Sequence, residues 1–463
     1  MTGRAAFQES CRWLDAGQDP HLEHYFTPTR SIEHVAAFGA PETLAVGIKG
    51  VGKSSAFRYF TEFDQNADIV VGVTPESHTV HLPNRKLHYS TCMKQFEYDL
   101  VIEALKAVVD RRSQLSLNAK VPAPILDQAA KHVSTFKKSL VKWAGRLGGI
   151  SVLGCGFTVN APPTETPALV GIEGDAKIVE PRRTLEALCR AGIRIRLVVD
   201  DPEQVFSASQ DLDAHLVGGF CLAALRLSST IENLKIIVLL KSHVYYQLLG
   251  QIDDLGKHID HAGRLSWTRE ELLEVIDHRL RWADVLWTNV FEASEADAHE
   301  LIADMSSEVR NGPRDLLRWL YYALERAAGG RVSRQHVEET RSQMAIEALR
   351  ELEVAFLNDY KGVTPVLRSI FGKDLSNSFT LDGLRAHIAD QLVTSREMRV
   401  LARLRWMQSQ TSHTLPAVFL RVGALAFQSG DSLVLPYNAG YDEGALERAT
   451  GIRLVPAIAA AIG

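Results

Sequence analysis

The sequence has little cysteine, no long apolar run and no large excess of charge of either sign. Its 463 residues include five cysteines, an odd number without a C-x-x-C pair, which indicates neither a disulfide framework nor a zinc site. The 56 acidic and 51 basic residues leave a formal net charge of −5, which excludes a broadly basic nucleic-acid-binding scaffold. No segment reaches the ~20 apolar residues of a membrane-spanning helix, and the N-terminus does not resemble a secretory signal. We therefore expect a cytoplasmic protein without a membrane span.

The apolar residues that are present predict a parallel α/β core. Two runs rich in Val, Ile and Leu, at 193–201 and 235–243, are flanked by helical patterns, as buried parallel strands are. Further strands are expected at 43–46 and 68–73, a last core strand at 265–267, and helices at 95–113 and 124–145. The segment 146–180 is rich in Gly, Pro, Thr and Val, which indicates a hairpin and loop insertion.

The second half of the chain is expected to be mainly helical. Thr268 and Glu271 have capping-box spacing, so a helix should begin there, and the helical pattern continues to about residue 370. Near the end, two strand runs at 424–437 flank the turn sequence Gln428–Asp431. Helices followed by a small hairpin are typical of a winged-helix domain.

A phosphate-binding loop is the most specific motif. Gly47–Ser54 (GIKGVGKS) fits G-x-x-x-x-G-K-[ST] in full and lies between a predicted strand and a predicted helix, as the motif requires. Glycines let backbone N–H groups converge on a phosphate chain, while Lys53 would reach the β- and γ-phosphates and Ser54 would bind Mg²⁺. The alternative is a glycine-rich surface turn. The expected nucleotide-binding residues are Gly47, Lys49, Gly50, Val51, Gly52, Lys53, Ser54 and Ser55.

Hydrolysis needs acidic residues as well, and the strand before Pro202 supplies them. Asp200 ends this strand, where open α/β sheets place their ligands, so we assign it to Mg²⁺. Asp201 is expected to orient or activate the attacking water, with Glu203 as the second candidate. An Asp-Asp-Pro-Glu sequence also begins helices well, and both interpretations can hold together.

Three basic residues are candidates for contacts to the γ-phosphate. Lys241 ends the next strand and is the candidate sensor, although it could equally be an exposed strand-end lysine. Arg314 follows the Asn311-Gly312-Pro313 break, at the start of a helix that would face the nucleotide; the alternative is a structural joint with Arg314 paired to a carboxylate. Arg264 is a candidate finger for a neighbouring subunit's nucleotide.

Taken in order, GIKGVGKSS, LVVDDPE, KIIVLLKSHVY, LSWTREELLEVIDHRL and NGPRDLLRWL resemble bacterial P-loop ATPases of the STAND/AAA+-related group, and among these the Sll1717-type P-loop ATPases. The resemblance covers residues of about 25–440. It implies an AAA+/STAND-like ATPase core that uses ATP and Mg²⁺, a helical lid, a winged-helix domain, and a conformational switch used in phage defence or signalling. The sequence departs from the family at Lys241–His243, where relatives often have Arg-Ser-Asp. Lys53 and Asp200 are also far apart for motifs on neighbouring strands, which predicts an insertion.

The predicted domains are an N-terminal segment (1–40), an ATPase core (41–267) with an insertion at about 120–180, a helical lid (268–345) and a winged-helix domain (346–463). These domains account for the chain, so an effector should be a separate protein, and a homo-oligomer is also expected. The first functional hypothesis is therefore a regulatory switch ATPase.

Two alternatives use the same domains. In a DNA-binding ATPase of origin-recognition-like layout, the winged helix would bind nucleic acid through the arginines at 396, 399, 403, 405 and 421, the first three of which share a helical spacing. A solvated helix face is the simpler explanation of the same arginines. In the third hypothesis the protein is a scaffold that holds its nucleotide and scarcely hydrolyses it.

Overall fold

The computed structural model describes residues 3–74, 89–113, 121–147, 176–203, 214–257, 261–356, 360–372, 378–430, 432–438 and 441–462. The chain forms two compact units. The first comprises Met1–Ser31, Gly47–Ser55 and Arg264–Gly463, and the second comprises Ile32–Val46 and Ala56–Gly263. Because the short segment Gly47–Ser55 folds with the residues that follow Arg264, neither unit is a continuous stretch of sequence.

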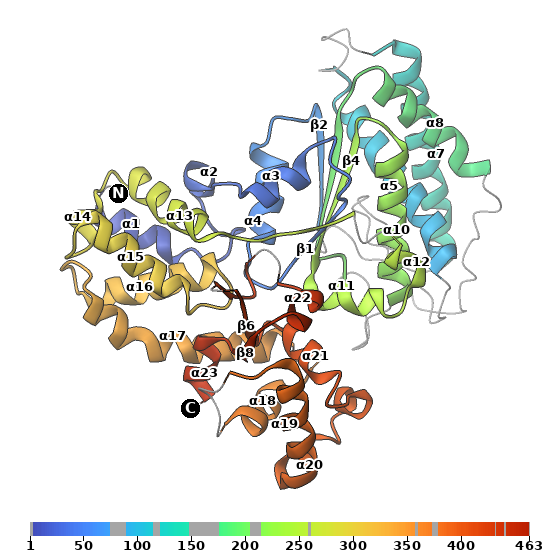
Figure 1. Ribbon diagram of the computed structural model, residues 1–463. Coiled ribbons are helices and arrows are strands. Elements are labelled where there is room, and N and C mark those ends of the chain that lie inside the picture. Colours follow the sequence, from blue (N-terminus) through green and yellow to red (C-terminus); the bar gives the residue numbers. More distant parts are fainter. Residues whose placement is uncertain are drawn as a thin grey trace. The chain divides into compact units, whose positions relative to one another are not determined.

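A five-stranded sheet with the order β2-β3-β4-β1-β5 forms the centre of the α/β core (Figure 1). Its strands are β1 (Leu44–Gly47), β2 (Ile69–Val73), β3 (Ile195–Asp200), β4 (Leu234–Lys241) and β5 (Ala262–Arg264). β3 pairs in parallel with both β2 and β4, and its last residue, Asp200, lies opposite Leu239. The prediction of a parallel α/β core is confirmed.

The strands differ from the sequence expectations in two respects, namely which strands are neighbours and where the last strand ends. β4 lies between β1 and β3, so the strands that precede the glycine-rich loop and the acidic residues are not neighbours. The long separation of Lys53 and Asp200 includes β2 and the helices that connect β2 to β3. The last core strand also ends at Arg264 rather than spanning 265–267, because the backbone N–H of Trp267 donates to the carbonyl of Tyr437, 2.9 Å away, instead of to a strand.

Helices α5, α7, α8 and α10 gather on one side of the strands, and α3 lies on the other (Figure 1). In this core the helical elements are α3 (Arg30–Ala36), α4 (Lys53–Arg58), the π-helix η1 (Tyr59–Phe63), α5 (Tyr89–Asp110), α7 (Ala123–Leu147), α8 (Ala176–Arg190), α10 (Ala214–Thr230), α11 (Ser242–Leu249) and α12 (Asp253–Gly256). The helices expected at 95–113 and 124–145 correspond to α5 and α7.

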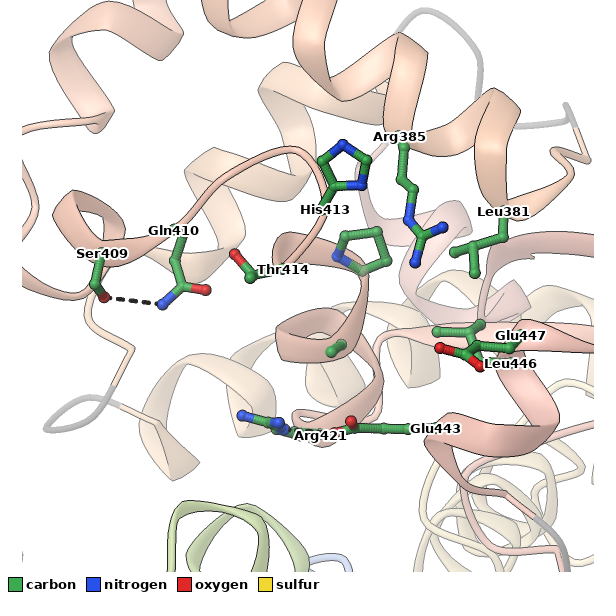
Figure 2. A pocket seen from close by; sticks show the side chains of 12 residues that line it. Leu381, Arg385, Ser409, Gln410, His413, Thr414, Arg421, Glu443, Leu446 and Glu447 are labelled. Carbon is green, nitrogen blue, oxygen red and sulfur yellow. Dashed lines mark hydrogen bonds and ion pairs between the residues drawn. The ribbon is translucent and has the colours of Figure 1, made fainter. Parts of the chain in front are cut away.

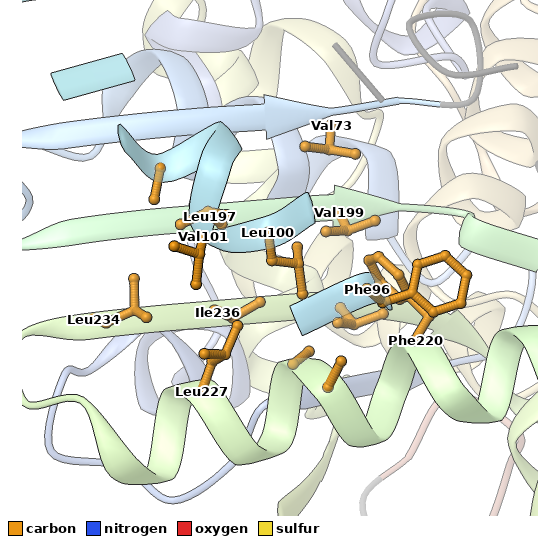
Figure 3. Close-up of a cluster of buried hydrophobic side chains, with 14 of the residues drawn as sticks. Val73, Phe96, Leu100, Val101, Leu197, Val199, Phe220, Leu227, Leu234 and Ile236 are labelled. Atoms are coloured by element: carbon orange, nitrogen blue, oxygen red, sulfur yellow. The ribbon is translucent and has the colours of Figure 1, made fainter. Parts of the chain in front are cut away.

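The core of the second unit lies between the strands and the pair α5 and α10 (Figure 3). Phe96 of α5 and Phe220 of α10 meet edge to face, with ring centroids 5.4 Å apart. A Cβ on Gly219 would lie 2.8 Å from the carbonyl oxygen of Tyr89, so this glycine lets the two helices approach closely. Full burial of such side chains stabilises the fold by roughly 1.5–3 kcal/mol each.

The first unit contains a helical region that begins as its sequence predicts. Thr268 caps α13 through a complete capping box, in which Glu271 N donates to Thr268 Oγ1 at 3.1 Å and Thr268 N donates to the Glu271 carboxylate at 2.7 Å. The helices of this region are α1 (Arg4–Arg12), α2 (Leu22–Tyr25), α13 (Arg269–Trp282), α14 (Trp287–Val290), α15 (Glu295–Ser306), α16 (Pro313–Arg326), α17 (Arg334–Ala355) and α23 (Pro456–Ile462).

The C-terminal part of the same unit combines helices with a small antiparallel sheet. Its elements are α18 (Val363–Phe371), α19 (Leu381–Thr394), α20 (Arg396–Leu401), the 3-10 helix η4 (Arg405–Ser409), α21 (Leu415–Arg421), β6 (Leu425–Ser429), β7 (Ser432–Val434), α22 (Glu443–Glu447) and β8 (Gly451–Leu454). β6 pairs with β7 and with β8. Ser429 lies opposite Ser432, so the expected hairpin at 424–437 is present.

Two further expectations concern a hairpin and loop at 146–180 and the absence of a membrane-spanning helix. The hairpin and loop predicted at 146–180 falls mainly on 148–175, outside the described residues, and residues 176–180 belong to α8. In the described parts of the chain, no helix is both long enough and apolar enough to cross a membrane.

Candidate nucleotide-binding site

The loop between β1 and α4 has the strand–loop–helix placement that its sequence predicts. β1 ends at Gly47 and α4 begins at Lys53. Gly50 and Gly52 have φ angles of 89° and 104°, in the left-handed region that favours glycine. A Cβ on Gly47 would lie 2.5 Å from Cγ1 of Val51, so this glycine lets the loop fold back on itself. The glycines thus permit the tight backbone path that a phosphate-binding loop requires.

The lysine of the motif is buried against its own loop. Lys53 Nζ donates to the carbonyl oxygens of Gly47 at 3.0 Å and Ile48 at 2.9 Å. The ammonium therefore lies over the loop, as a lysine that binds the β- and γ-phosphates must. Ser54 is exposed and Ser55 partly buried in the first turn of α4.

A tryptophan outside the motif holds the loop in place. The indole Nε1 of Trp267 donates to the carbonyl oxygen of Val51 at 2.7 Å, and a Cβ on Gly52 would lie 3.7 Å from the indole ring. Trp267 is itself held by the segment after β7, where Tyr437 O accepts from its backbone N–H at 2.9 Å and Asn438 Nδ2 donates to its carbonyl at 3.2 Å. The C-terminal part of the chain therefore supports the loop through Trp267.

The Asn-Gly-Pro-Arg turn packs against the same loop. Gly312 has φ 61° and Pro313 begins α16, as the sequence predicts. A Cβ on Gly50 would lie 2.8 Å from Cβ of Asn311 and 3.4 Å from Cδ of Arg314. The structure thus brings Arg314 next to the glycine-rich loop, as expected of a residue that contacts the nucleotide.

The residues around Arg314 concern the alternative that it is a structural residue paired with a carboxylate. Among the described residues, no carboxylate lies within ion-pair distance of its guanidinium. The next arginine along α16, Arg318, is instead the one that pairs with a carboxylate, since its Nη2 lies 2.5 Å from Oε1 of Glu351. The charge of Arg314 also acts on Glu351, and the contact role of Arg314 stays a prediction.

A buried polar network fixes the turn that carries Arg314. Asn311 is fully buried, and its Nδ2 donates to Asp315 Oδ1 and Glu351 Oε2, each at 3.2 Å. The backbone N–H of Asn311 donates to Asp315 Oδ2 at 3.0 Å. Burial and the neighbouring Glu351 raise the pKa of Asp315, whereas Arg310 and Arg318 oppose that rise. These hydrogen bonds fix the position of Asn311 against Gly50, although Asn311 Oδ1 has no hydrogen-bond partner among the described residues.

In the second unit, the acidic residues gather at the carboxyl ends of β3 and β4. Asp200 is the last residue of β3, and Asp201 follows it with φ 45°, an uncommon conformation for a residue other than glycine. Lys241 is the last residue of β4, and its Nζ lies 3.2 Å from both Asp201 Oδ2 and Glu203 Oε1. Asp201, Glu203 and Lys241 therefore form one cluster beside Asp200.

Burial and neighbouring charges both shift the pKa values of Glu203 and Lys241 in this cluster. Burial raises the pKa of Glu203, Lys241 lowers it and Asp201 raises it again. For Lys241, burial lowers the pKa of the ammonium, but the carboxylates of Glu203 and Asp201 outweigh burial and raise it. Lys241 is therefore a charged residue engaged by two carboxylates rather than an exposed strand-end lysine.

The oxygen donors of the two predicted Mg²⁺ ligands suit this ion. Ser54 offers a hydroxyl and Asp200 a carboxylate, the hard oxygen ligands that Mg²⁺ takes together with phosphate oxygens and waters. Within the described residues there is no group of three or more His, Cys, Asp or Glu side chains that could hold a metal ion by themselves.

Replacing Gly50 by alanine tests the packing of the loop against the turn. The new Cβ would require a positive φ and would lie 2.8 Å from Cβ of Asn311. We expect a loss of about 1–3 kcal/mol in stability and at least about tenfold weaker binding of ATP, measured by thermal unfolding and calorimetry. Gly39→Ala is the matched control, because a Cβ there meets no atom within 4 Å. If Gly50→Ala behaves like this control, the close contact does not matter for the loop.

Sequence reasoning missed the residues that support the loop. Trp267 belonged to a segment predicted as a strand, and Tyr437 to the end of a predicted hairpin strand. Trp267 contacts the loop and Tyr437 contacts Trp267, although Tyr437 and Trp267 lie far from the loop in the sequence. The only local signal was a tryptophan directly before the capping box at Thr268.

Comparisons with known proteins give limited information. No protein-family model matches the sequence, and no curated protein matches it. The fold is similar to the Walker-type ATPase PABY2304 of Pyrococcus abyssi, with 13% identity, a TM-score of 0.44, and coverage of 94% of this chain and 95% of that one. It is also similar to the ORC2 protein of Aeropyrum pernix, solved as ADPNP–ADP complexes, with 13% identity, a TM-score of 0.42, and coverage of 93% and 96%. Scores below 0.5 identify neither the family nor the activity of this chain.

Proposed function

We propose that this chain is a Mg²⁺-dependent ATPase that works as a regulatory switch. The observation that carries the proposal is the packing of the glycine-rich loop, with Lys53 buried over it, against the turn that bears Arg314. A loop that binds phosphates and is in contact with a helix start can transmit the presence of a γ-phosphate to that helix.

Each predicted site residue has a role in this proposal. The backbone of Gly47–Ser55 and the Lys53 ammonium bind the phosphates, and Ser54 and Asp200 hold Mg²⁺. When bound, the ion neutralises negative charge on the β- and γ-phosphates. Asp201, or Glu203 in its place, orients the attacking water and takes its proton. Lys241 and Arg314 are the sensors of the γ-phosphate.

Replacing Arg314 by alanine is the experiment that tests the switch. We expect ATP affinity to change less than about threefold, because most of the binding comes from the loop, whereas ATP turnover falls at least about tenfold. Both quantities are measured on the full chain, by calorimetry with a non-hydrolysable analogue and by phosphate release.

Arg326→Ala is the matched control for this experiment, because Arg326 lies on the same helix and pairs with Glu339 at the surface. Wild-type turnover in Arg314→Ala would remove the sensor role. A loss of stability equal in both variants would show a general effect on α16 instead.

A second candidate function is a scaffold that holds ATP and hydrolyses it very slowly. The pairing of Lys241 with both Asp201 and Glu203 favours it, since carboxylate oxygens occupied by an ammonium are not available to orient the attacking water. Nucleotide that stays as ATP on the purified protein for hours would support the scaffold, and ready conversion to ADP would support the switch.

DNA binding through the C-terminal region receives mixed support. An isolated antiparallel β-bridge pairs Phe379, just before α19, with Ile452 of β8, a neighbourhood that is compatible with a winged-helix domain. However, α21, which precedes β6 as a recognition helix would, is largely buried, and its Arg421 pairs with Glu443 at 2.8 Å. Arg403 also lies beyond the end of α20, so the helical face predicted for it does not form.

The partners and the setting of the switch rest on the sequence resemblance alone. A homo-oligomer or a separate effector protein, a cytoplasmic location, and a role in bacterial defence or signalling of the STAND type are part of the proposal. Light scattering of the protein with ATP-Mg²⁺ and with ADP-Mg²⁺ addresses the first of these, because an assembly switch changes its mass with the nucleotide.

A further inference from the structure

A pocket of about 420 Å³ lies in the C-terminal part of the first unit, away from the glycine-rich loop in sequence (Figure 2). Three segments enclose it, namely the start of α19, the stretch from η4 through α21, and α22. Its volume is within the range of pockets that bind small molecules. Neither the P-loop chemistry nor the acidic cluster accounts for it.

One wall of the pocket carries an arginine whose donors are only partly used. In the described part of the chain, the buried Nε of Arg385 has no hydrogen-bond acceptor. Its Nη1 pairs with Asp382 at 3.2 Å, but that carboxylate is 94% exposed and so holds the guanidinium weakly. Figure 2 shows the Arg385 guanidinium and the His413 ring on the same side of the pocket.

The other walls carry an ion pair, polar side chains and some apolar surface. Arg421 Nε and Glu443 Oε1 form an ion pair at 2.8 Å on the side opposite Arg385 (Figure 2). Leu381, Pro416 and Leu446 supply the apolar lining. A ligand that enters therefore meets one under-used guanidinium beside walls of mixed polarity, with the carboxylate of Glu447 among them.

We propose that this pocket binds a small organic carboxylate. The guanidinium of Arg385, whose side chain is 28% exposed, matches a carboxylate in shape and charge. The apolar body of the acid would lie on Leu381, Pro416 and Leu446. Glu447 also lines the pocket and adds a negative charge, so a polyanion such as a nucleotide or polyphosphate is disfavoured.

The pocket is connected to the glycine-rich loop by a short chain of contacts, all within the first unit. Arg421 lines the pocket, and the next carbonyl, that of Val422, accepts from Nη2 of the fully buried Arg310 at 3.2 Å. Arg310 is followed by Asn311, which packs against Gly50. A ligand that shifts α21 would thus act on the loop through two residues. This coupling rests on the proposed ATP site, whereas the pocket itself does not.

Binding of named probes to the full chain tests the pocket. The probes are benzoate and 3-methylbutanoate, and their binding is measured by saturation-transfer NMR and calorimetry. Methyl benzoate is the control for charge, and inorganic phosphate is the control for shape. We expect both carboxylates to bind with a Kd below about 10 mM, and both controls to bind at least about tenfold more weakly.

Arg385→Gln should weaken the binding of the carboxylates at least about tenfold, because a charge-assisted hydrogen-bond pair is lost. Arg396→Gln, on the exposed start of α20 and outside the pocket, should leave it unchanged. The proposal is overturned if neither carboxylate binds, if phosphate binds as well as benzoate, or if Arg385→Gln binds like the wild type with the same thermal stability.

The coupling has its own readout. Saturating benzoate should change the affinity for an ATP analogue, and the analogue should change the affinity for benzoate by the same factor. Benzoate binding without any effect on the analogue would keep the pocket and remove the coupling. Absence of analogue binding, with benzoate binding intact, would instead contradict the proposed ATP site.

Discussion

Replacing Lys53 by alanine is expected to abolish nucleotide binding, with a loss of at least about 100-fold in affinity. The Lys53 ammonium donates to the carbonyl oxygens of Gly47 and Ile48, and a charged hydrogen bond to the phosphates would be lost with it. Calorimetry with ATP-Mg²⁺ measures the effect. A parallel melting curve is needed, because Lys53 also donates to Gly47 and Ile48 and its removal can loosen the loop.

Lys257→Ala serves as the control for this change. Lys257 is exposed and pairs with Asp254 at 2.6 Å, so its removal costs a surface ion pair and nothing at the loop. Normal nucleotide binding by Lys53→Ala, with wild-type melting, would contradict the assignment of Gly47–Ser54 as a phosphate-binding loop. A folded Lys53→Arg protein with intermediate affinity would support a role of the charge as well as of its position.

Asp201→Asn is expected to reduce ATP turnover at least about 100-fold while nucleotide affinity changes less than about threefold. A water-activating carboxylate contributes to the chemical step, and an amide cannot take the proton. Asparagine also tolerates the left-handed backbone of this position, φ 45°, so the substitution should leave the chain path intact. Single-turnover hydrolysis and calorimetry with an analogue separate the two effects.

Glu203→Gln distinguishes the two candidate bases. Glu203 is buried and shares Lys241 with Asp201, so either residue can serve as the base. If only Glu203→Gln loses turnover, the catalytic role moves to Glu203. If neither variant loses it, this cluster has no part in hydrolysis. Asp304→Asn, at an exposed ion pair in the other unit, is the control for a general change of charge.

Much of the α/β core could be predicted because its signals are local. The run that became β1, the glycines of the loop and the capping box at Thr268 each act within a few residues. The order of the strands is a different kind of information. It depends on where β4 inserts, and nothing in the sequence of β1 or β3 states that β4 lies between them.

The supports of the site could not be predicted for the same reason. The hydrogen bond from Trp267 to Val51 and the packing of Asn311 on Gly50 join residues more than two hundred positions apart. Arg314 was found because Asn-Gly-Pro marks the start of its helix, a local feature, whereas its distance from the loop came only with the structure. The pocket beside Arg385 likewise needs three separate segments to exist.

The support of the loop by residues near the C-terminus has a consequence for synthesis on the ribosome. The chain grows from its N-terminus, so Val51 leaves the ribosome long before Trp267, and Tyr437 follows much later. At about 5–20 residues per second, the wait for Tyr437 lasts roughly 20–80 s. During this time the glycine-rich loop lacks the partners that hold it in the finished protein. Under the proposed function, we therefore expect a nascent chain to bind nucleotide less tightly than the completed protein, so that nucleotide loading waits until the C-terminal region has folded.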